Sequence, residues 1–500
     1  MCGICGVWNH RADELVGSML KRMHHRGPDE NGILTAEKGS LGHSRLSIMD
    51  PEHGKQPIYS EDGSRAVIAN GEIYNFPALY EELKGKHTFR TKNDSEVLLH
   101  LYEEYGPGMV DKIEGMFAFC IKDGDELFVA RDHIGIKPLY YGFKEDGTFL
   151  FTSELKTYDG NDYPITEFPP GTWYRADEGF HRFYEVPYVE TRDAPEEVHI
   201  QEVRSTLERA VEKRLMSDVP LGTFLSGGLD SSIISALVAK RIDGLHTFSV
   251  GLPGSGDLPA AQAVADHIGS NHHTYILDPN EILEKLPDII YHLESFDQDL
   301  VRSAVPCYFT SRMAAEYVKV IHTGEGADEL FGGYTYYKEI DEDDILHREL
   351  IRSVSTLHNI NLQRVDRMTM AHSLEGRVPF LDCEMIVTGQ RVPAELKIKG
   401  DPPMEKWVLR KAFEHLLPEE IVWRRKKQFD EGTGISEAMP ALTAEVMSDA
   451  EADSIIEEYA SFGIRSREEA YYFKIFIDFF SDRKHIIDNV ARWAERPEFV

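Results

Sequence analysis

The secondary-structure pattern of this chain changes near residue 190, and the change calls for two different architectures. Up to about residue 185, short alternating strands dominate and a few helical patterns lie between them. The strand patterns are 65–71, 116–121 and 126–130, and the helical patterns are 13–24, 77–84 and 95–105. Strands gathered in one region with a few helices predict a layered α+β domain over residues 2–185.

Residues 186–200 begin with a proline-containing, charged stretch and are expected to link this domain to a second one over 201–500. In the second region, strands and helices alternate, which predicts an α/β doubly wound parallel sheet whose ligands collect at the carboxyl ends of the strands. The expected helices are 201–215, one from 231, 260–268 and one near 304–317, and the expected strands are one ending at 225, 245–250, 274–277 and 318–322. After residue 340 the pattern is mostly helical.

Composition excludes several classes of protein. The 500 residues are 42% hydrophobic, which is enough for two separate cores. The formal net charge of −32 repels nucleic acid and anionic membranes, so neither is an expected partner. No apolar run reaches the ~18 residues that a membrane span needs, and the early residues Asp13 and Glu14 do not fit a signal peptide. We therefore expect a cytoplasmic protein.

Cys2 follows the initiator residue Met1, and removal of Met1 would place a thiol and a free amine on one residue. An α-amino group titrates near ~8 and a thiol near ~8.5, so the amine can take the thiol proton and leave a nucleophilic thiolate. Alternatively, Cys2 and Cys5 could form a redox pair or half of a zinc site, although no second ligand pair has the required spacing. Cys120 and Cys307 lie among apolar residues and are expected to be buried thiols.

A glycine- and serine-rich loop at residues 225–232 follows an apolar strand and opens an apolar helix. Gly227 and Gly228 allow close backbone approach, while Ser226, Ser231 and Ser232 direct donors at an anion near the helix N-terminus. The loop lacks the lysine of a Walker motif and the spacing of a dinucleotide-binding motif. A pyrophosphate group fits these donors, and the simpler alternative is an ordinary turn.

A second acidic, glycine-rich segment, 323–334, comes directly after the strand expected at 318–322 and should lie at the same sheet edge. Asp230 and Asp328 would then offer oxygen ligands to Mg²⁺ that bridges phosphates. Each aspartate could instead cap a helix or a turn.

Several further motifs occur together. They are His25-Arg26-Gly27-Pro28-Asp29, Arg45-Leu46-Ser47-Ile48-Met49, Asn70-Gly71-Glu72-Ile73-Tyr74-Asn75, Asn93-Asp94-Ser95-Glu96, Arg131-Asp132-His133-Ile134-Gly135-Ile136-Lys137-Pro138, Phe248-Ser249-Val250-Gly251-Leu252-Pro253-Gly254-Ser255, Arg377-Val378-Pro379-Phe380-Leu381-Asp382 and Arg424-Arg425-Lys426-Lys427-Gln428-Phe429. With Cys2 and the 225–232 loop, they make the chain resemble glutamine-hydrolysing asparagine synthetases from residue 2 to about 434. The resemblance implies a class II glutaminase with an N-terminal-nucleophile αββα sandwich, followed by an ATP pyrophosphatase-type synthetase domain and a mostly helical C-terminal region.

In the first domain, the resemblance implies that Cys2 is the nucleophile and that Arg45 pairs with the carboxylate of glutamine. Asp94 and Glu72 would hold the ammonium of glutamine, and Asn70 and Gly71 would form the oxyanion hole. The full implied glutamine site is Arg45, Leu46, Ser47, Ile48, Met49, Asn70, Gly71, Glu72 and Asp94. Asn70-Gly71 is also a strong type I′ hairpin signal, and Arg45 could be a surface cation.

In the second domain, Glu325 matches the base for attacking ammonia, and Lys426 matches a cation over the phosphates. The implied ATP site is Leu225, Ser226, Gly227, Gly228, Asp230, Ser231, Ser232, Val250, Thr323 and Gly324, with Asp230 and Asp328 as the metal ligands. A lysine in a basic run, such as Lys426, is otherwise typical of a solvated surface.

The expected reaction is glutamine-dependent asparagine synthesis. Cys2 hydrolyses glutamine, and ammonia passes through a dry internal passage to aspartate that MgATP has activated as β-aspartyl-AMP, giving asparagine, AMP and pyrophosphate. A related ligase that acts on another carboxylate and a non-catalytic nucleotide or glutamine sensor are the alternatives. Glutamine, aspartate and ATP are the expected partners, and a homodimer is the assembly considered.

Overall fold

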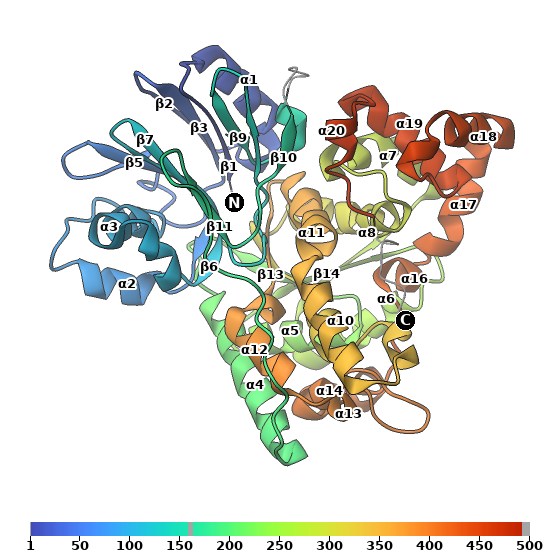
Figure 1. Ribbon diagram of the computed structural model, residues 1–500. Helices are drawn as coiled ribbons and strands as arrows, with labels where there is room; N and C mark the ends of the chain where they lie inside the picture. Colours follow the sequence, from blue (N-terminus) through green and yellow to red (C-terminus); the bar gives the residue numbers. More distant parts are fainter. Residues whose placement is uncertain (1, 159–163, 493–500) are drawn as a thin grey trace.

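The computed structural model describes residues 2–158 and 164–492. Within these residues, the N-terminal part folds into two antiparallel sheets of six strands each (Figure 1). Sheet A has the order β10 (Ile165–Glu167), β8 (Tyr140–Phe143), β9 (Phe149–Thr152), β1 (Gly3–Trp8), β3 (Gly39–Arg45) and β2 (Glu30–Thr35). Sheet B has the order β12 (Gly179–Arg182), β11 (Thr172–Arg175), β7 (Glu126–Arg131), β6 (Gly115–Asp123), β5 (Arg65–Ile73) and β4 (Ile58–Tyr59).

The two sheets pack face to face, because alternate residues of each strand point to opposite faces. Ile4 and Trp8 of β1 share one buried core with Phe151 of β9 and Ile68 of β5. On the outer faces, α1 (Asp13–Arg22) covers sheet A, and α2 (Phe76–Leu83) and α3 (Glu96–Tyr105) cover sheet B. The αββα sandwich and the helices and strands expected in this region are confirmed.

The C-terminal part is built on sheet C, in which all neighbouring strands are parallel. Its order is β15 (Asn271–Ile276), β14 (His246–Gly251), β13 (Leu221–Phe224), β16 (Val320–His322) and β17 (Glu375–Arg377). Leu221 and Val320 pack with the helices of one face, whereas Phe248 and Ile321 pack with the other. The doubly wound parallel sheet is therefore confirmed.

Six described helices surround sheet C before residue 340, and the sequence pattern predicted all of them except the fourth and the last. They are α4 (Glu196–Lys213), α5 (Leu229–Ala239), α6 (Asp257–Ile268), α7 (Pro279–Leu293), α8 (Gln298–Ala314) and α9 (Ala327–Phe331). Residues 183–195 have no regular secondary structure, and α4 begins at Glu196, inside the segment expected as a linker.

The region after residue 340 is mostly helical, as expected. It contains α10 (Asp343–Ser355), α11 (Asn361–Met370), α12 (Cys383–Arg391), α13 (Ala394–Lys397), α14 (Trp407–Phe413), α15 (Glu419–Val422), α16 (Phe429–Thr433), α17 (Ile435–Val446), α18 (Asp449–Glu458), α19 (Arg467–Phe480) and α20 (Lys484–Ile487). Among the described helices, none combines the length and the apolar character that crossing a bilayer requires.

The two parts pack against each other through an extended interface. Leu46, Met116 and Ile134 from the N-terminal part belong to the same buried apolar cluster as Leu225 and Val378 from the C-terminal part. The two parts therefore share a water-excluding contact.

Candidate active site

Cys2 lies directly before β1 and is almost completely buried, with 7% of its surface exposed. Its backbone nitrogen donates to Asn70 Oδ1 at 3.0 Å, and its Sγ lies 4.0 Å from the carbonyl oxygen of Leu46. Arg26 Nε donates to the Cys2 carbonyl oxygen at 2.9 Å. Burial raises the pKa of the Cys2 thiol, so the thiolate needs a base close by.

The other cysteines do not pair with Cys2 in this structure. Cys5 Sγ lies 4.0 Å from the carbonyl oxygen of Val16 on α1, and Cys2 and Cys5 are both free thiols. The redox-pair interpretation therefore has no support. Cys120 and Cys307 are buried, as expected.

Asn70 and Gly71 lie inside β5, opposite Ala118 and Phe117 of β6. The hairpin-turn interpretation is therefore wrong, because strand pairing over nine residues overrides the local turn signal. A Cβ atom on Gly71 would lie 2.0 Å from the carbonyl oxygen of Met116, so only glycine fits there. Asn70 Nδ2 is buried and has no hydrogen-bond partner. An unpartnered amide N–H of this kind can donate a hydrogen bond to an oxyanion.

The backbone N–H of Gly71 points to one edge of β5, and its neighbours along the strand show which edge this is. Ala69 N donates to Gln56 Oε1 at 2.6 Å, and Ile73 N donates to Asp94 Oδ2 at 2.7 Å. Alternate N–H groups of a strand point to the same edge, so the Gly71 N–H lies between these two, beyond the end of β4. The Gly71 N–H is thus on the edge of β5 that faces away from β6, and the hydrogen bond from the Cys2 nitrogen to Asn70 Oδ1 places the Asn70 amide beside Cys2.

Three buried carboxylates gather beside this strand. Burial, followed by the nearby charges of Glu375 and Asp94, raises the pKa of Glu72, and burial raises the pKa of Asp94 to about 6. Arg377 Nη2 lies 3.6 Å from Glu72 Oε2, and Arg377 Nε donates to Glu375 Oε1 at 2.7 Å. Glu72, Asp94 and Glu375 outnumber the guanidinium of Arg377, which pairs with Glu72 and Glu375. A bound ammonium group would relieve the repulsion between these carboxylates.

Arg45 is buried, so its interpretation as a surface cation is wrong. Its guanidinium donates to Glu30 Oε2 at 2.7 Å and to the carbonyl oxygens of Asp50 at 2.7 Å and Met49 at 3.2 Å. These bonds fold the segment that contains Leu46, Ser47, Ile48 and Met49 around Arg45. The same segment supplies the Leu46 carbonyl oxygen that faces Cys2 Sγ.

A cavity of about 310 Å³ lies at the carboxyl ends of β13, β14 and β16. Most of the residues expected to bind ATP line it, together with Glu325, Asp328 and Lys426. The expected residues in the lining are Leu225, Ser226, Asp230, Ser231, Val250, Thr323 and Gly324. Gly227, Gly228 and Ser232 lie outside this lining, and the Ser232 hydroxyl donates to the Gly228 carbonyl oxygen at 2.7 Å. Ser232 therefore stabilises the loop from within.

The 225–232 loop has the conformation that anion binding requires. Gly227 has a φ of 74°, and a Cβ atom there would lie 2.5 Å from the backbone nitrogen of Ala261. The hydroxyls of Ser226 and Ser231 lie 3.0 Å apart at the N-terminus of α5. These two hydroxyls border the cavity, where an anion could receive hydrogen bonds from them.

Asp230 and Asp328 come together, but two lysines lie between them. Lys406 Nζ lies 2.5 Å from Asp230 Oδ2 and 2.6 Å from Asp328 Oδ1, and Lys426 Nζ lies 2.8 Å from Asp328 Oδ2. Although burial opposes ionisation, Lys406 and Lys426 hold the pKa of Asp328 below its usual range. Lys426 is therefore part of the site and not a solvated surface residue. Asp230 Oδ1 is buried without a hydrogen-bond partner, so it can accept a cation.

Lys406 and Arg364 were not anticipated from the sequence. Lys406 has a φ of 57°, which is rare for a residue other than glycine and is typical of functional sites. Arg364, from α11, lines the cavity and forms an ion pair with Glu325, the expected base.

A smaller basic pocket adjoins the cavity and shares Ser226, Asp230, Ser231 and Lys426 with it. Its cationic lining is Lys406, Arg410, Arg424, Arg425, Lys426 and Lys427. Such a pocket suits a polyanion next to the serine-rich loop.

Comparisons with known proteins agree with this two-site arrangement. The glutamine amidotransferase domain family matches residues 1–169. The asparagine synthase family matches residues 202–344 and 338–485, which extends past the resemblance noted from the sequence.

Similar proteins cover nearly the whole chain. Asparagine synthetase B [glutamine-hydrolyzing] of Escherichia coli is 38% identical over 96% of this chain and 91% of its own length. A probable asparagine synthetase [glutamine-hydrolyzing] of Schizosaccharomyces pombe is 37% identical over 100% of this chain and 97% of its own. Asparagine synthetase [glutamine-hydrolyzing] 3 of Arabidopsis thaliana is 41% identical over 87% and 80%, respectively.

Proposed function

Because this chain belongs to the glutamine-hydrolysing asparagine synthetase family, we propose that it converts aspartate to asparagine with glutamine as nitrogen donor and ATP as activator. The observation that carries the proposal is the presence of two built sites in one chain. One has a buried cysteine beside an unpartnered amide donor, and the other is a cavity bordered by a phosphate-binding loop.

In the first site, the α-amine of processed Cys2 takes the thiol proton, and the thiolate attacks the carboxamide carbon of glutamine. Asn70 Nδ2 and the Gly71 N–H stabilise the oxyanion, ammonia leaves, and water hydrolyses the thioester to glutamate. Glu72 and Asp94 hold the ammonium of glutamine, and the segment around Arg45 orients its carboxylate. The excess of negative charge and the edge-pointing N–H groups support these roles.

In the second site, the β-carboxylate of aspartate attacks the α-phosphorus of ATP, which forms β-aspartyl-AMP and releases pyrophosphate. The 225–232 loop and the basic pocket receive the phosphates, and Lys426 stabilises the developing charge. Ammonia then attacks the acyl carbon, with Glu325 as the base that removes a proton, and AMP leaves.

Asp230 and Asp328 would hold Mg²⁺ in this site, and the unpartnered Asp230 Oδ1 fits that role. A bound Mg²⁺ supplies charge neutralisation for the phosphates. Lys406 bridges the two carboxylates, and, although burial opposes ionisation, Lys406 and Lys426 hold the pKa of Asp328 below its usual range.

The proposed domain division is a glutaminase domain at 2–185, a linker at 186–200 and a synthetase domain at 201–500. Ammonia is a nucleophile only when it is unprotonated, so it must cross from one domain to the other without meeting bulk water. The apolar cluster shared by Leu46, Met116, Leu225 and Val378 supports a dry route. The proposed location is the cytoplasm and the proposed assembly is a homodimer, which light scattering of the purified protein would check.

The proposal is tested with the pure enzyme, ATP, Mg²⁺, glutamine and a panel of acceptors that includes aspartate, glutamate and β-alanine. We expect asparagine, AMP and pyrophosphate in equal amounts with aspartate, and at most trace pyrophosphate with the others. Pyrophosphate release with another acceptor but not with aspartate would support a related ligase instead. Binding of ATP or glutamine without any turnover would support a sensor.

A further inference from the structure

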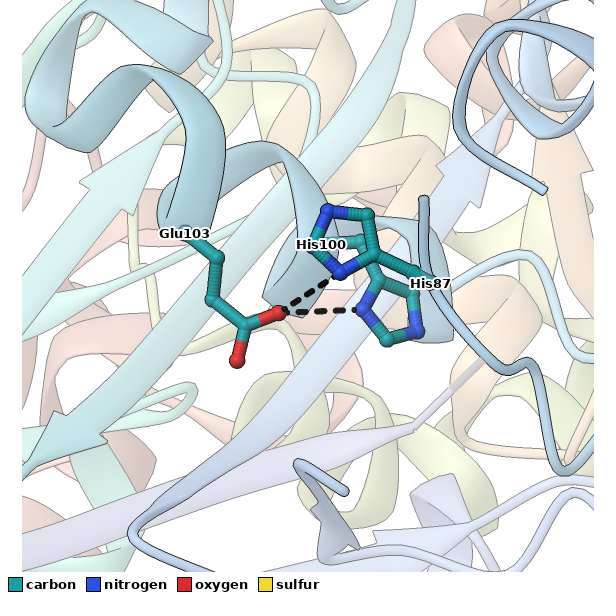
Figure 2. A group of neighbouring side chains, drawn as sticks. All are labelled: His87, His100 and Glu103. Atoms are coloured by element: carbon teal, nitrogen blue, oxygen red, sulfur yellow. Dashed lines mark hydrogen bonds and ion pairs between the residues drawn. The ribbon is translucent and has the colours of Figure 1, made fainter. Parts of the chain in front are cut away.

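A cluster of metal-ligand side chains lies on α3 and the loop that precedes it, outside both proposed active sites. Figure 2 shows His87, His100 and Glu103 pointing toward one another. Glu103 Oε2 lies 3.2 Å from His87 Nδ1 and 3.1 Å from His100 Nδ1, and one ligand atom from each residue lies within 4.8 Å of the others. His100 is buried, while His87 and Glu103 are partly exposed, so an ion could enter from solvent.

Each histidine of the cluster also has a carboxylate on its other ring nitrogen. Glu104 Oε1 lies 3.2 Å from His87 Nε2, and Glu96 Oε1 lies 3.8 Å from His100 Nε2. This pattern orients metal-binding histidines in proteins, because the outer carboxylate fixes the tautomer that leaves Nδ1 free for the ion. The His100 Nε2 atom is buried without a hydrogen-bond partner, and a small movement of Glu96 toward it would supply an acceptor.

Two of the three distances between ligand atoms agree with a tetrahedral ion. Metal–nitrogen and metal–oxygen bonds of about 2.0–2.1 Å place neighbouring ligand atoms of a tetrahedron about 3.3 Å apart. The two contacts of Glu103 Oε2 with the histidines are already close to that value. Two histidines and one glutamate are a ligand set typical of Zn²⁺, with the fourth position left for water. We infer that His87, His100 and Glu103 form a Zn²⁺ site.

The site would connect two segments of the glutaminase domain. His100 and Glu103 belong to α3, whereas His87 belongs to the 84–95 loop that precedes it. The second half of this loop is already held by α3, because Arg90 N and Thr91 N each donate to the Glu96 carboxylate at 2.7 Å. Zn²⁺ bound by His87 would also hold the first half of the loop against α3. Asp94 lies near the end of this loop, so the ion would stabilise the segment that positions this carboxylate.

The experiment counts Zn²⁺ on the full-length chain by mass spectrometry after dialysis and measures affinity by calorimetry with Zn²⁺ itself. All samples carry Cys2→Ala, so the active-site thiol cannot contribute. We expect one bound Zn²⁺ per chain and a higher unfolding temperature with Zn²⁺. His87→Ala and Glu103→Gln should each weaken binding more than about 100-fold, since each removes one of three ligands.

Two further variants separate a built site from a damaged fold. Glu104→Gln leaves all three ligands in place and should weaken Zn²⁺ binding about 10- to 100-fold through His87. His10→Ala removes an exposed histidine elsewhere and should bind Zn²⁺ like its parent. Circular dichroism checks that every variant is folded. Equal Zn²⁺ binding by the parent, His87→Ala and Glu103→Gln, or no binding by the folded parent at micromolar Zn²⁺, would overturn the assignment.

Discussion

Arg26 and Asp366 form a buried, two-bond ion pair across the interface between the two parts of the chain. Arg26 Nη1 donates to Asp366 Oδ2 at 2.7 Å, and Arg26 Nη2 donates to Asp366 Oδ1 at 3.1 Å. The same guanidinium donates through Nε to the carbonyl oxygen of Cys2. One side chain therefore connects the backbone of Cys2 to α11 in the C-terminal part.

The Arg26–Asp366 pair should stabilise the folded protein. Asp366→Ala removes two hydrogen bonds from the buried Arg26 guanidinium and leaves Glu154 as its carboxylate partner, so we expect a loss of about 3 kcal/mol in the free energy of unfolding. Urea unfolding followed by circular dichroism measures the loss. The exposed pair Lys484 and Asp488 is the control, and Asp488→Ala should change the midpoint little. Equal midpoints for both variants would show that the buried pair does not hold the interface.

Asn70 allows the oxyanion role to be separated from a positioning role. Its Nδ2 atom is the proposed donor, while its Oδ1 atom accepts from the Cys2 nitrogen. Asn70→Ala should lower kcat for glutamine hydrolysis about 10²- to 10³-fold. Asn70→Asp keeps the acceptor but loses the donor, so it should be at least as slow. Near-normal hydrolysis by a folded Asn70→Asp variant would assign Asn70 to positioning Cys2 instead.

Glutamine binding should weaken in acid. Burial raises the pKa of Asp94 to about 6, so this carboxylate is charged at neutral pH and gains a proton below pH 6. A neutral Asp94 no longer attracts the ammonium of glutamine, and Kd should rise about tenfold per pH unit below that point. Calorimetry with the Cys2→Ala variant between pH 7.5 and 5 measures binding without turnover. Asp94→Asn should bind weakly at every pH, and a flat profile for its parent would contradict the role of Asp94.

Lys406 should affect only the synthetase reaction. Lys406→Met leaves Asp230 and Asp328 close together with less positive charge between them, so their repulsion of ATP should increase. We expect the KM for ATP to rise about 10- to 100-fold, which corresponds to losing one or two charged hydrogen bonds. Glutamine hydrolysis without ATP should keep its kcat. Equal losses in both half-reactions would point to a general folding defect.

The parts of the sites that form from neighbouring residues could be predicted from the sequence. The loop containing Gly227 follows a strand and opens a helix, and this local order already indicates an anion site. The segment after β16 is predicted at the same sheet edge as this loop, because the carboxyl ends of parallel strands meet there. The turn signal of Asn70-Gly71 predicts the wrong local structure, because the turn preference of two residues is weaker than the pairing of the whole of β5 with β6.

The remaining features depend on contacts between distant residues. Lys406 reaches Asp230 across 176 positions, and no spacing rule connects a lysine before a short helix with a phosphate loop. Arg364 likewise reaches the cavity only because α11 packs against α8. The short strand β17 has three residues, too few for a hydrophobic period, and Pro287 interrupts the helical pattern of α7.

The central claim is that one chain releases ammonia at Cys2 and uses it at the distant cavity. Cys2→Ala tests it most directly, with asparagine formation measured from aspartate and ATP with either glutamine or ammonium. We predict no synthesis with glutamine and near-parental synthesis with ammonium, because only the first site loses its nucleophile. Glutamine-dependent synthesis that survives in the variant, or loss of ammonium-dependent synthesis from a folded variant, would contradict the account.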